Sequence, residues 1–155
     1  MVQGDVGDEE LSELIRLMAE AASAFMRGDM RTYAALMRHA DDYTLMPPRG
    51  GEPVRGFDDS DEALEALASY FHGGEANLEV FESYTSGNLA VLVAIERQRG
   101  SVGRFPDQDW SLRLTLVFRR EGSAWRLVHR HADPLVHELG EEQLAELARG
   151  SAVAP

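Results

Sequence analysis

The chain has 155 residues, of which 44% are hydrophobic, and its 27 acidic and 15 basic residues give a formal net charge of −12. This length fits one domain with a substantial core. Such a negative surface would repel phosphates, so we expect no nucleic-acid partner. The absence of cysteine excludes disulfides and thiol chemistry. No apolar run is long enough to cross a membrane, and the first residues lack a signal-peptide pattern, so we expect a cytoplasmic protein without a membrane partner.

The N-terminal half predicts three amphipathic helices with two short strands between the second and the third. Apolar residues recur at helical spacing, and Gly28 and Asp29 suit the end of one helix and the N-cap of the next. Gly73 and Gly74 are expected to end the third helix. The predicted helices lie at residues 10–26, from 29 to about 39, and 58–71, and the strands lie at 41–46 and around 54.

The second half changes to the alternating period of β-strands. Four β-rich runs occupy residues 77–84, 89–97, 110–119 and 125–133. Mostly short connections favour an antiparallel meander, and the order of helices first and sheet later indicates an α+β domain. The longest connection is a loop around residues 100–107, and a last helix is expected at 141–147. The chain then divides into a flexible N-terminus (1–9), the domain (10–137) and a C-terminal helix with its tail (138–155).

Two of the predicted strands are apolar on both faces. Residues 90–95 are apolar without interruption, and in residues 114–118 only Thr115 breaks the apolar run. An antiparallel sheet with one solvated face would instead alternate with polar residues. One face therefore packs on the helices, and we expect the other face to meet a second copy in a homodimer.

The last predicted strand carries His129, His131 and Asp133 at every second position. If Trp125 and Leu127 point inward, these three residues do so too. Histidine titrates near neutrality, and a neighbouring carboxylate can orient it for acid–base chemistry. The alternative is structural, because a histidine here can simply bond a helix carboxylate while the aspartate caps the end of the strand. The two histidines lack a convincing third ligand, so we expect no metal.

Other candidate residues lie on the first strand and in the meander. Asp41 and Asp42 are expected to orient His131. Glu96 shares a face with small residues near the end of its strand, which suits a ligand acceptor or base, although a cross-strand ion pair with Arg113 is the alternative. Candidate pocket aromatics, which are otherwise plain core, are Tyr43 and Trp110. No phosphate-binding glycine loop is visible, so no cofactor is expected.

Residues from about 10 to 135 resemble the nuclear transport factor 2-like superfamily, also called SnoaL-like or ketosteroid-isomerase-like. The resemblance rests on Gly28-Asp29 between two helices, on Ala40-Asp41-Asp42 before a strand, and on the closing segment GSAWRLVHRH at residues 122–131. That ending looks most like the branch with the association domain of calcium/calmodulin-dependent protein kinase. The resemblance implies a cone, in which a strongly bent sheet wraps round three helices and leaves a pocket at the wide end.

The resemblance also bears on function. The three catalytic positions of ketosteroid isomerases would fall at Pro47, Ala21 and Leu114, so that activity is not expected. Dehydratases of the superfamily pair a pocket histidine with an aspartate from the end of the second helix. The expected pairing of His131, with His129 beside it, resembles that arrangement. The kinase domains place a pocket arginine near Arg113, which implies an acidic ligand.

Two functions remain open. One is a cofactor-free dehydratase, isomerase or cyclase that acts on a hydrophobic oxygenated substrate. The other is a non-catalytic ligand-binding or dimeric association module.

Overall fold

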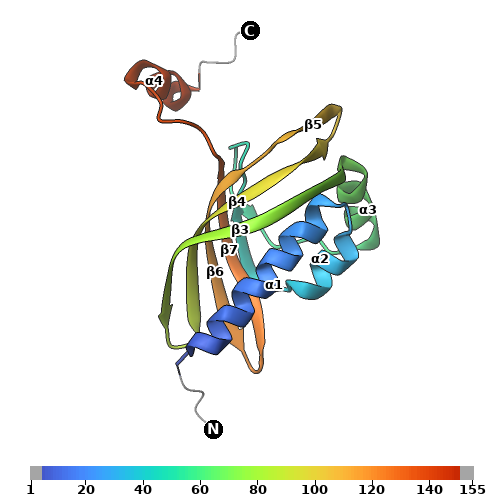
Figure 1. Cartoon of the computed structure of the whole chain (residues 1–155), viewed down its shortest axis with the longest axis vertical. Helices are drawn as coiled ribbons and strands as arrows, with labels where there is room; N and C mark the ends of the chain where they lie inside the picture. Colours follow the sequence, from blue (N-terminus) through green and yellow to red (C-terminus); the bar gives the residue numbers. More distant parts are fainter. Residues whose placement is uncertain (1–4, 151–155) are drawn as a thin grey trace.

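The computed structural model describes residues 5–150, which form a seven-stranded sheet and four helices (Figure 1). Two helices precede the first strand, the third lies between the second and third strands, and the fourth follows the last strand. The helices are α1 (Asp8–Met26), α2 (Met30–Leu36), α3 (Asp61–Tyr70) and α4 (Glu141–Arg149). The strands are β1 (His39–Met46), β2 (Val54–Arg55), β3 (Phe71–Ser86), β4 (Leu89–Val102), β5 (Phe105–Asp109), β6 (Leu112–Glu121) and β7 (Ala124–Pro134). The predictions for residues 1–4 and 151–155 lie outside the described residues.

The sheet has the strand order β2-β1-β7-β6-β4-β3, with β5 paired to β4. The antiparallel meander predicted for the second half is confirmed. The pairing of β1 with β7 is parallel, which makes the sheet mixed and brings the first strand beside the last. Figure 1 shows the sheet bent round α1, so the α+β cone that the resemblance implied is confirmed.

Helix α1 fills the inside of the cone. It begins at Asp8, two residues earlier than predicted, because three acidic residues in its first turn complement the positive end of the helix dipole. Leu14 and Met18 are almost fully buried on its inner side, and the helix packs mainly against β3 and α2. Opposite it, Leu92, Leu116 and Phe118 form the inner face of the central strands. These contacts form the core of the domain.

Several predicted boundaries around α3 and the strands that follow it are wrong. Helix α3 starts after Ser60, whose hydroxyl caps Ala63 N at 3.2 Å, and it ends at Tyr70. Gly74 does not stop a helix, because it lies inside β3 where a Cβ would come 2.4 Å from the carbonyl oxygen of Arg99. The loop predicted around residues 100–107 is instead the β4–β5 hairpin.

The two faces of the sheet differ in burial, as the doubly apolar pattern predicts. Along β4, residues 90, 92, 94 and 96 are buried, while Val91, Val93 and Ile95 on the other side remain partly exposed. The homodimer expected from this pattern stays a prediction. None of the helices in the described part of the chain is long and apolar enough to span a membrane.

Candidate functional site

Five polar or ionisable side chains meet inside the cone, and we refer to them as the interior cluster. They come from α2, β1, β4 and β7 and are Tyr33, His39, Tyr43, Glu96 and Arg130. Charged residues are rarely buried in a protein unless they are paired. The cluster therefore needs a chemical explanation.

An ion pair between Glu96 and Arg130 forms the charged half of the interior cluster. Arg130 Nη2 lies 3.1 Å from Glu96 Oε2, and the side chains are 17% and 5% exposed. Burial alone would lower the pKa of Arg130, but the negative charge of Glu96 and the nearby tyrosines raise it above its usual value. The guanidinium is thus a fixed positive charge inside the cone.

His39 and the two tyrosines form the uncharged half. The hydroxyl of Tyr33 lies 3.3 Å from His39 Nε2, and the imidazole stacks on Phe57 with 3.9 Å between ring centres. Burial, with a smaller contribution from the charge of Arg130, lowers the pKa of His39 to about 4. Burial also raises the pKa of Tyr43 to about 12 and shifts the pKa of Tyr33 upward. At neutral pH the imidazole is therefore neutral and both hydroxyls keep their protons.

A β-bulge in β7 decides which of its side chains enter the cone. Phe118 pairs with Leu127, but the next residue of β6, Val117, pairs with His129, so Val128 is an extra residue. The extra residue reverses the alternation, and Arg130 points inward opposite the fully buried Leu116.

The inward orientation expected for His129, His131 and Asp133 is consequently wrong. All three lie on the outer face of the sheet, because the bulge places them on the opposite side from Arg130. His131 is 46% exposed, and its Nε2 lies 3.6 Å from Asp133 Oδ2. His129 Nδ1 lies 2.8 Å from the hydroxyl of Thr44.

The expected pairing of His131 with Asp41 or Asp42 does not form either. Asp42 receives two hydrogen bonds from Arg119, at 2.8 and 3.2 Å, which lower its pKa. Asp41 is exposed at the edge of a cavity described below. Neither aspartate acts as the partner that the resemblance suggested for His131.

The other predicted site residues separate into two groups. Glu96 and Tyr43 belong to the interior cluster. The alternative ion pair of Glu96 with Arg113 is wrong, because Glu96 pairs with Arg130 while Arg113 lies exposed on the outer face. Trp110 lies away from the cluster, where its indole N–H donates to the carbonyl of Gly100 at 3.1 Å.

A cavity of about 510 Å³ adjoins the interior cluster. It lies between the end of α2, the start of β1 and the segment before α3, and both His39 and Phe57 line it. Arg38 and Arg126 bring two positive charges to its wall, and Asp41 and Asp59 bring two negative ones. His39 therefore has one side on the cavity and its Nε2 on the interior cluster.

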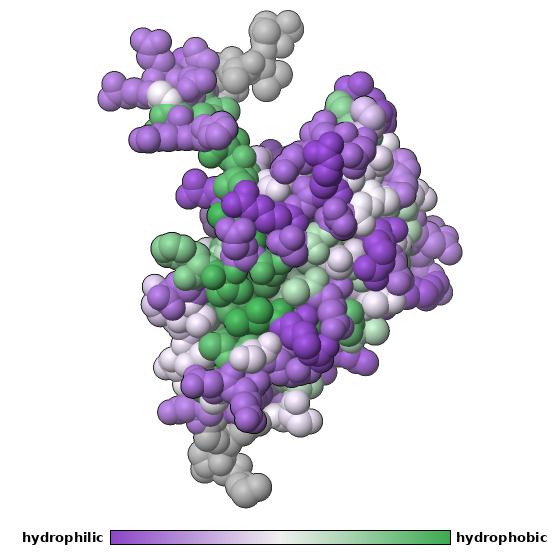
Figure 2. Space-filling view, in the orientation of Figure 1, coloured by the Kyte–Doolittle hydropathy of each residue, from purple (hydrophilic) through white to green (hydrophobic). Residues whose placement is uncertain are grey.

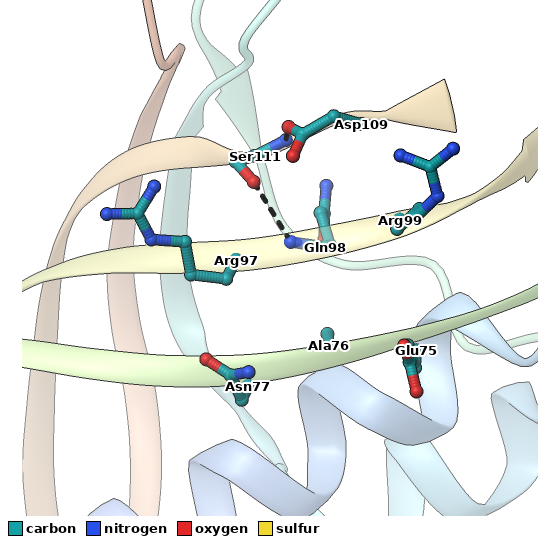
Figure 3. Close-up of a pocket in the computed structure, with 8 residues that line it drawn as sticks. All are labelled: Glu75, Ala76, Asn77, Arg97, Gln98, Arg99, Asp109 and Ser111. Atoms are coloured by element: carbon teal, nitrogen blue, oxygen red, sulfur yellow. Dashed lines mark hydrogen bonds between the residues drawn. The ribbon is translucent and has the colours of Figure 1, made fainter. Parts of the chain in front are cut away.

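A second cavity, of about 240 Å³, lies on β3, β4 and the start of β6 (Figure 3). Its cations are engaged, because Arg97 pairs with Glu79 at 3.1 Å and Arg99 pairs with Asp107 at 2.8 Å. The hydroxyl of Ser111 accepts a hydrogen bond from the backbone N–H at position 98, at 3.2 Å. These contacts hold the strands together, so the interior cluster is the better candidate site. Among residues 5–150, no group of three or more metal-ligating side chains is placed to hold an ion.

Three members of the interior cluster were not found from the sequence: Tyr33, His39 and Arg130. The sequence places Tyr33 on the apolar side of the second predicted helix and does not mark it as a site residue. The sequence predicts His39 at the end of a helix, whereas it begins β1. Arg130 falls between two histidines, and strict alternation puts it outside. No local signal in the sequence marks the bulge that turns it inward.

A bent sheet round three helices, with a polar cluster inside, defines a small α+β pocket protein. Residues 14–136 match the model of the SnoaL-like domain, and the chain belongs to this family of the nuclear transport factor 2-like superfamily. A comparison with curated proteins found no match.

Solved structures with the same fold come from several functional classes. A candidate dehydratase of the NTF2-like family from Streptomyces avermitilis is 19% identical, with a TM-score of 0.63 over 83% of this chain and 96% of its own. A candidate scytalone dehydratase from Novosphingobium aromaticivorans is 14% identical, with a TM-score of 0.67 over 85% and 90%. The CaMKII association domain of C. elegans is 12% identical, with a TM-score of 0.59 over 81% and 95%. At these identities the likeness shows the fold alone.

Proposed function

We propose that the protein binds a small, uncharged, oxygenated and partly hydrophobic molecule at the interior cluster and dehydrates or isomerises it without a cofactor. The observation that carries the proposal is the convergence of five polar side chains inside the cone. A buried ion pair is commonly no more stabilising than well-packed apolar residues of similar size. Perturbed ionisable groups gathered beside a cavity are typical of functional sites.

The charge balance of the cluster favours an uncharged ligand. Glu96 neutralises Arg130, and the imidazole and both hydroxyls carry no charge at neutral pH. An anion that approached Arg130 would also meet the carboxylate of Glu96. A hydroxyl or carbonyl oxygen avoids this repulsion and can still accept a hydrogen bond, since a guanidinium has five N–H donors and the Arg130 side chain is 17% exposed.

The cluster holds groups suited to an elimination of water. The carboxylate of Glu96 would take the proton from a carbon next to a carbonyl, and Arg130 would stabilise the negative charge that develops on that carbonyl oxygen. The hydroxyl of Tyr33, next to His39, would donate a proton to the departing hydroxyl group. The C–H and C–O bonds break, a C=C bond forms and water leaves. The dehydratase names of two structural relatives support this reaction class by fold-level analogy.

A second candidate function is ligand binding without turnover. The observation that favours it is the low pKa of His39, because an imidazole with a pKa of about 4 is a weak proton acceptor near neutrality. The same fold also occurs in the CaMKII association domain.

The test uses a panel of hydroxylated aromatic ketones, with binding followed by ligand-detected NMR and dehydration followed by absorbance. We expect Glu96→Gln to keep binding but to lower turnover by roughly 10²–10⁴-fold, the usual contribution of a general base. Arg113→Met removes an arginine from the outer face and should change neither measurement. Binding that is unaffected when Glu96→Leu and Arg130→Met are combined would overturn the proposal. Binding without turnover by the unaltered protein would select the second candidate.

The same variants test whether the ion pair is kept for function rather than for stability. Arg130→Met alone leaves Glu96 buried without its partner, which should cost about 3–5 kcal/mol of unfolding free energy. The double variant Glu96→Leu/Arg130→Met removes both charges and should recover most of that loss. Urea denaturation of the single and double variants measures both values. A double variant as unstable as the single one would show that the pair itself is needed for folding.

A further inference from the structure

Glu96, the proposed base, and both tyrosines of the interior cluster are closed to solvent. Glu96 and Tyr43 are each 3% exposed, and Tyr33 is 6% exposed. The cavity of about 510 Å³ beside the cluster has the usual size of a ligand pocket, but none of these three residues lines it. A ligand that enters this cavity therefore has to pass its wall before it reaches Glu96.

The wall between the cavity and the cluster is a stack of two rings, Phe57 and His39. Both residues line the cavity, and their rings lie 3.9 Å apart between centres, with 13° between their planes. The ring centre of Tyr33 lies 6.0 Å from that of Phe57, and the ring centre of Tyr43 lies 4.5 Å from that of His39. The hydroxyl of Tyr33 contacts His39 at 3.3 Å, so Phe57 is the part of the wall that is free to move.

The segment that carries Phe57 has few attachments to the rest of the domain. In residues 49–60, every residue except Phe57 is exposed. The pairing of β2 with β1 and the N–H of Gly56, which donates to the carbonyl of Tyr43 at 2.8 Å, hold its backbone. Within the described part of the chain, the backbone of residues 57–59 makes no hydrogen bond. The ring of Phe57 can therefore leave the stack without breaking a backbone hydrogen bond.

The closed position is the resting state of this wall. Away from it, the apolar ring of Phe57 would meet water, and Figure 2 shows a hydrophilic surface on α3, the helix that follows the segment. Stacked aromatic rings gain more than the burial of their area alone. A planar ring that takes the place of Phe57 on His39 restores this stack, whereas a saturated ring does not.

We propose that Phe57 is the gate of the interior cluster, and that a planar aromatic ring of the ligand displaces it and stacks on His39 in its place. The exchange of rings rests on the proposed function, whereas the opening of the gate does not. The inference narrows the ligand class from partly hydrophobic molecules to planar aromatic ones that carry an oxygen. A ligand stacked on His39 would direct this oxygen inward, to the N–H groups of Arg130.

Cysteine reactivity tests the gate without a ligand, because the chain has no cysteine of its own. Tyr43→Cys places a thiol behind the wall, and its modification by methyl methanethiosulfonate, a small uncharged reagent, is followed by mass spectrometry. Adding Phe57→Ala should raise the rate of modification roughly tenfold, about the factor that one aromatic stack is worth. The control is Ala90→Cys, which is fully buried and belongs neither to the cavity wall nor to the interior cluster. Its rate should not change.

Two results of the cysteine experiment overturn the gate. One is an unchanged rate at position 43 when Phe57→Ala is added. The other is an equal rise at positions 43 and 90, which would mean that Phe57 only stabilises the fold. Neither result depends on the binding of a ligand, so a failure of the gate is distinct from a failure of the proposed function.

Ligand-detected NMR tests the exchange of rings with 2-naphthol and decahydro-2-naphthol, which share their carbon skeleton and hydroxyl but differ in planarity. We expect 2-naphthol to bind roughly 2- to 10-fold more tightly, and His39→Leu to remove this preference. Phe57→Ala should tighten the binding of 2-naphthol by a similar factor, because the ligand no longer competes for His39. The control is Phe105→Ala, which removes an exposed ring of β5 and should leave both affinities unchanged.

Weaker binding of 2-naphthol to Phe57→Ala would mean that Phe57 is a fixed part of the binding site, and it overturns the proposal. Equal affinity of the unaltered protein for the two compounds overturns the stacking on His39. If neither compound binds to the unaltered protein or to Phe57→Ala, the exchange of rings fails together with the proposed function, and the cysteine rates alone decide whether Phe57 is a gate.

Discussion

At the scale of single residues, His39 shows how burial fixes a protonation state. Its pKa of about 4 lies below the value of about 6.5 expected in the unfolded chain. Below about pH 6.5 the unfolded chain takes up a proton that the folded chain refuses, so acid favours unfolding. The associated stability is complete above about pH 6.5 and is lost as the pH falls toward 4. Its size is up to about 3 kcal/mol.

We predict that NMR titration of His39 gives a midpoint near pH 4, and that His39→Gln removes part of the loss of stability in acid. The glutamine keeps a hydrogen-bonding group near Tyr33 but does not titrate. Urea denaturation at several pH values measures the difference. The control is His72→Gln, since His72 is exposed and bonds only the carbonyl of Gly103 among the described residues. A midpoint for His39 near 6.5 would contradict the prediction.

Glu96 and Arg130 form one ion pair, but only one of the two could be predicted from the sequence as a site residue. Glu96 could be found, because β4 alternates without a break from Ala90 to Glu96. Arg130 could not, because one extra residue at Val128 reverses every side chain that follows it. Whether a strand bulges depends on its neighbours in the sheet, and that information is absent from the strand itself.

At the scale of elements, the turn at Gly28 connects α1 with α2 and touches the junction of α3 and β3. Its φ is +81°, and a Cβ at this position would lie 2.4 Å from the carbonyl oxygen of Phe71. Gly56 has nearly the same φ, +78°, but nothing lies within 4 Å of its virtual Cβ. The two glycines thus share their backbone conformation and differ in the space around them.

We predict that Gly56→Ala costs about 1–2 kcal/mol, the usual penalty of a left-handed conformation for alanine. Gly28→Ala should cost clearly more, because it adds a clash with backbone that cannot rotate away. Urea denaturation of both variants measures the difference. Equal losses would mean that the contact with Phe71 has no energetic role.

Element boundaries also show where the sequence was ambiguous. The order of the helices and the existence of most strands, though not of β5, could be predicted from periodicity, since α1, α3 and β4 each keep one period over many residues. The sequence predicts a helix stop at Gly73 and Gly74, yet both residues lie in β3, and Gly74 lets β3 and β4 approach closely. Glycine has the same local signature in both roles, and only the partner strand distinguishes them.

At the scale of the whole molecule, the net charge of −12 surrounds an interior cluster whose own charges cancel. This arrangement weakens the binding of anionic ligands in two ways. The surface repels them at a distance, and salt screens this repulsion, since the Debye length falls from about 30 Å at 0.01 M to about 8 Å at 0.15 M. The carboxylate of Glu96 repels them inside the cone, where screening is weaker because the group is buried.

We predict that 2-naphthol binds more tightly than 2-naphthoate, which has the same ring system and a negative charge at pH 7. The difference in affinity between the two compounds should become smaller, but not vanish, as the salt concentration rises. Glu96→Gln should remove most of the remaining difference, because it leaves Arg130 free to pair with the carboxylate of 2-naphthoate. Ligand-detected NMR titrations of both compounds at two salt concentrations, with the unaltered protein and with Glu96→Gln, measure the contributions of the surface charge and of Glu96 separately. Arg113→Met, on the outer face, should leave both affinities unchanged. Tighter binding of 2-naphthoate to the unaltered protein would contradict the prediction and favour the acidic ligand that the position of Arg113 first suggested.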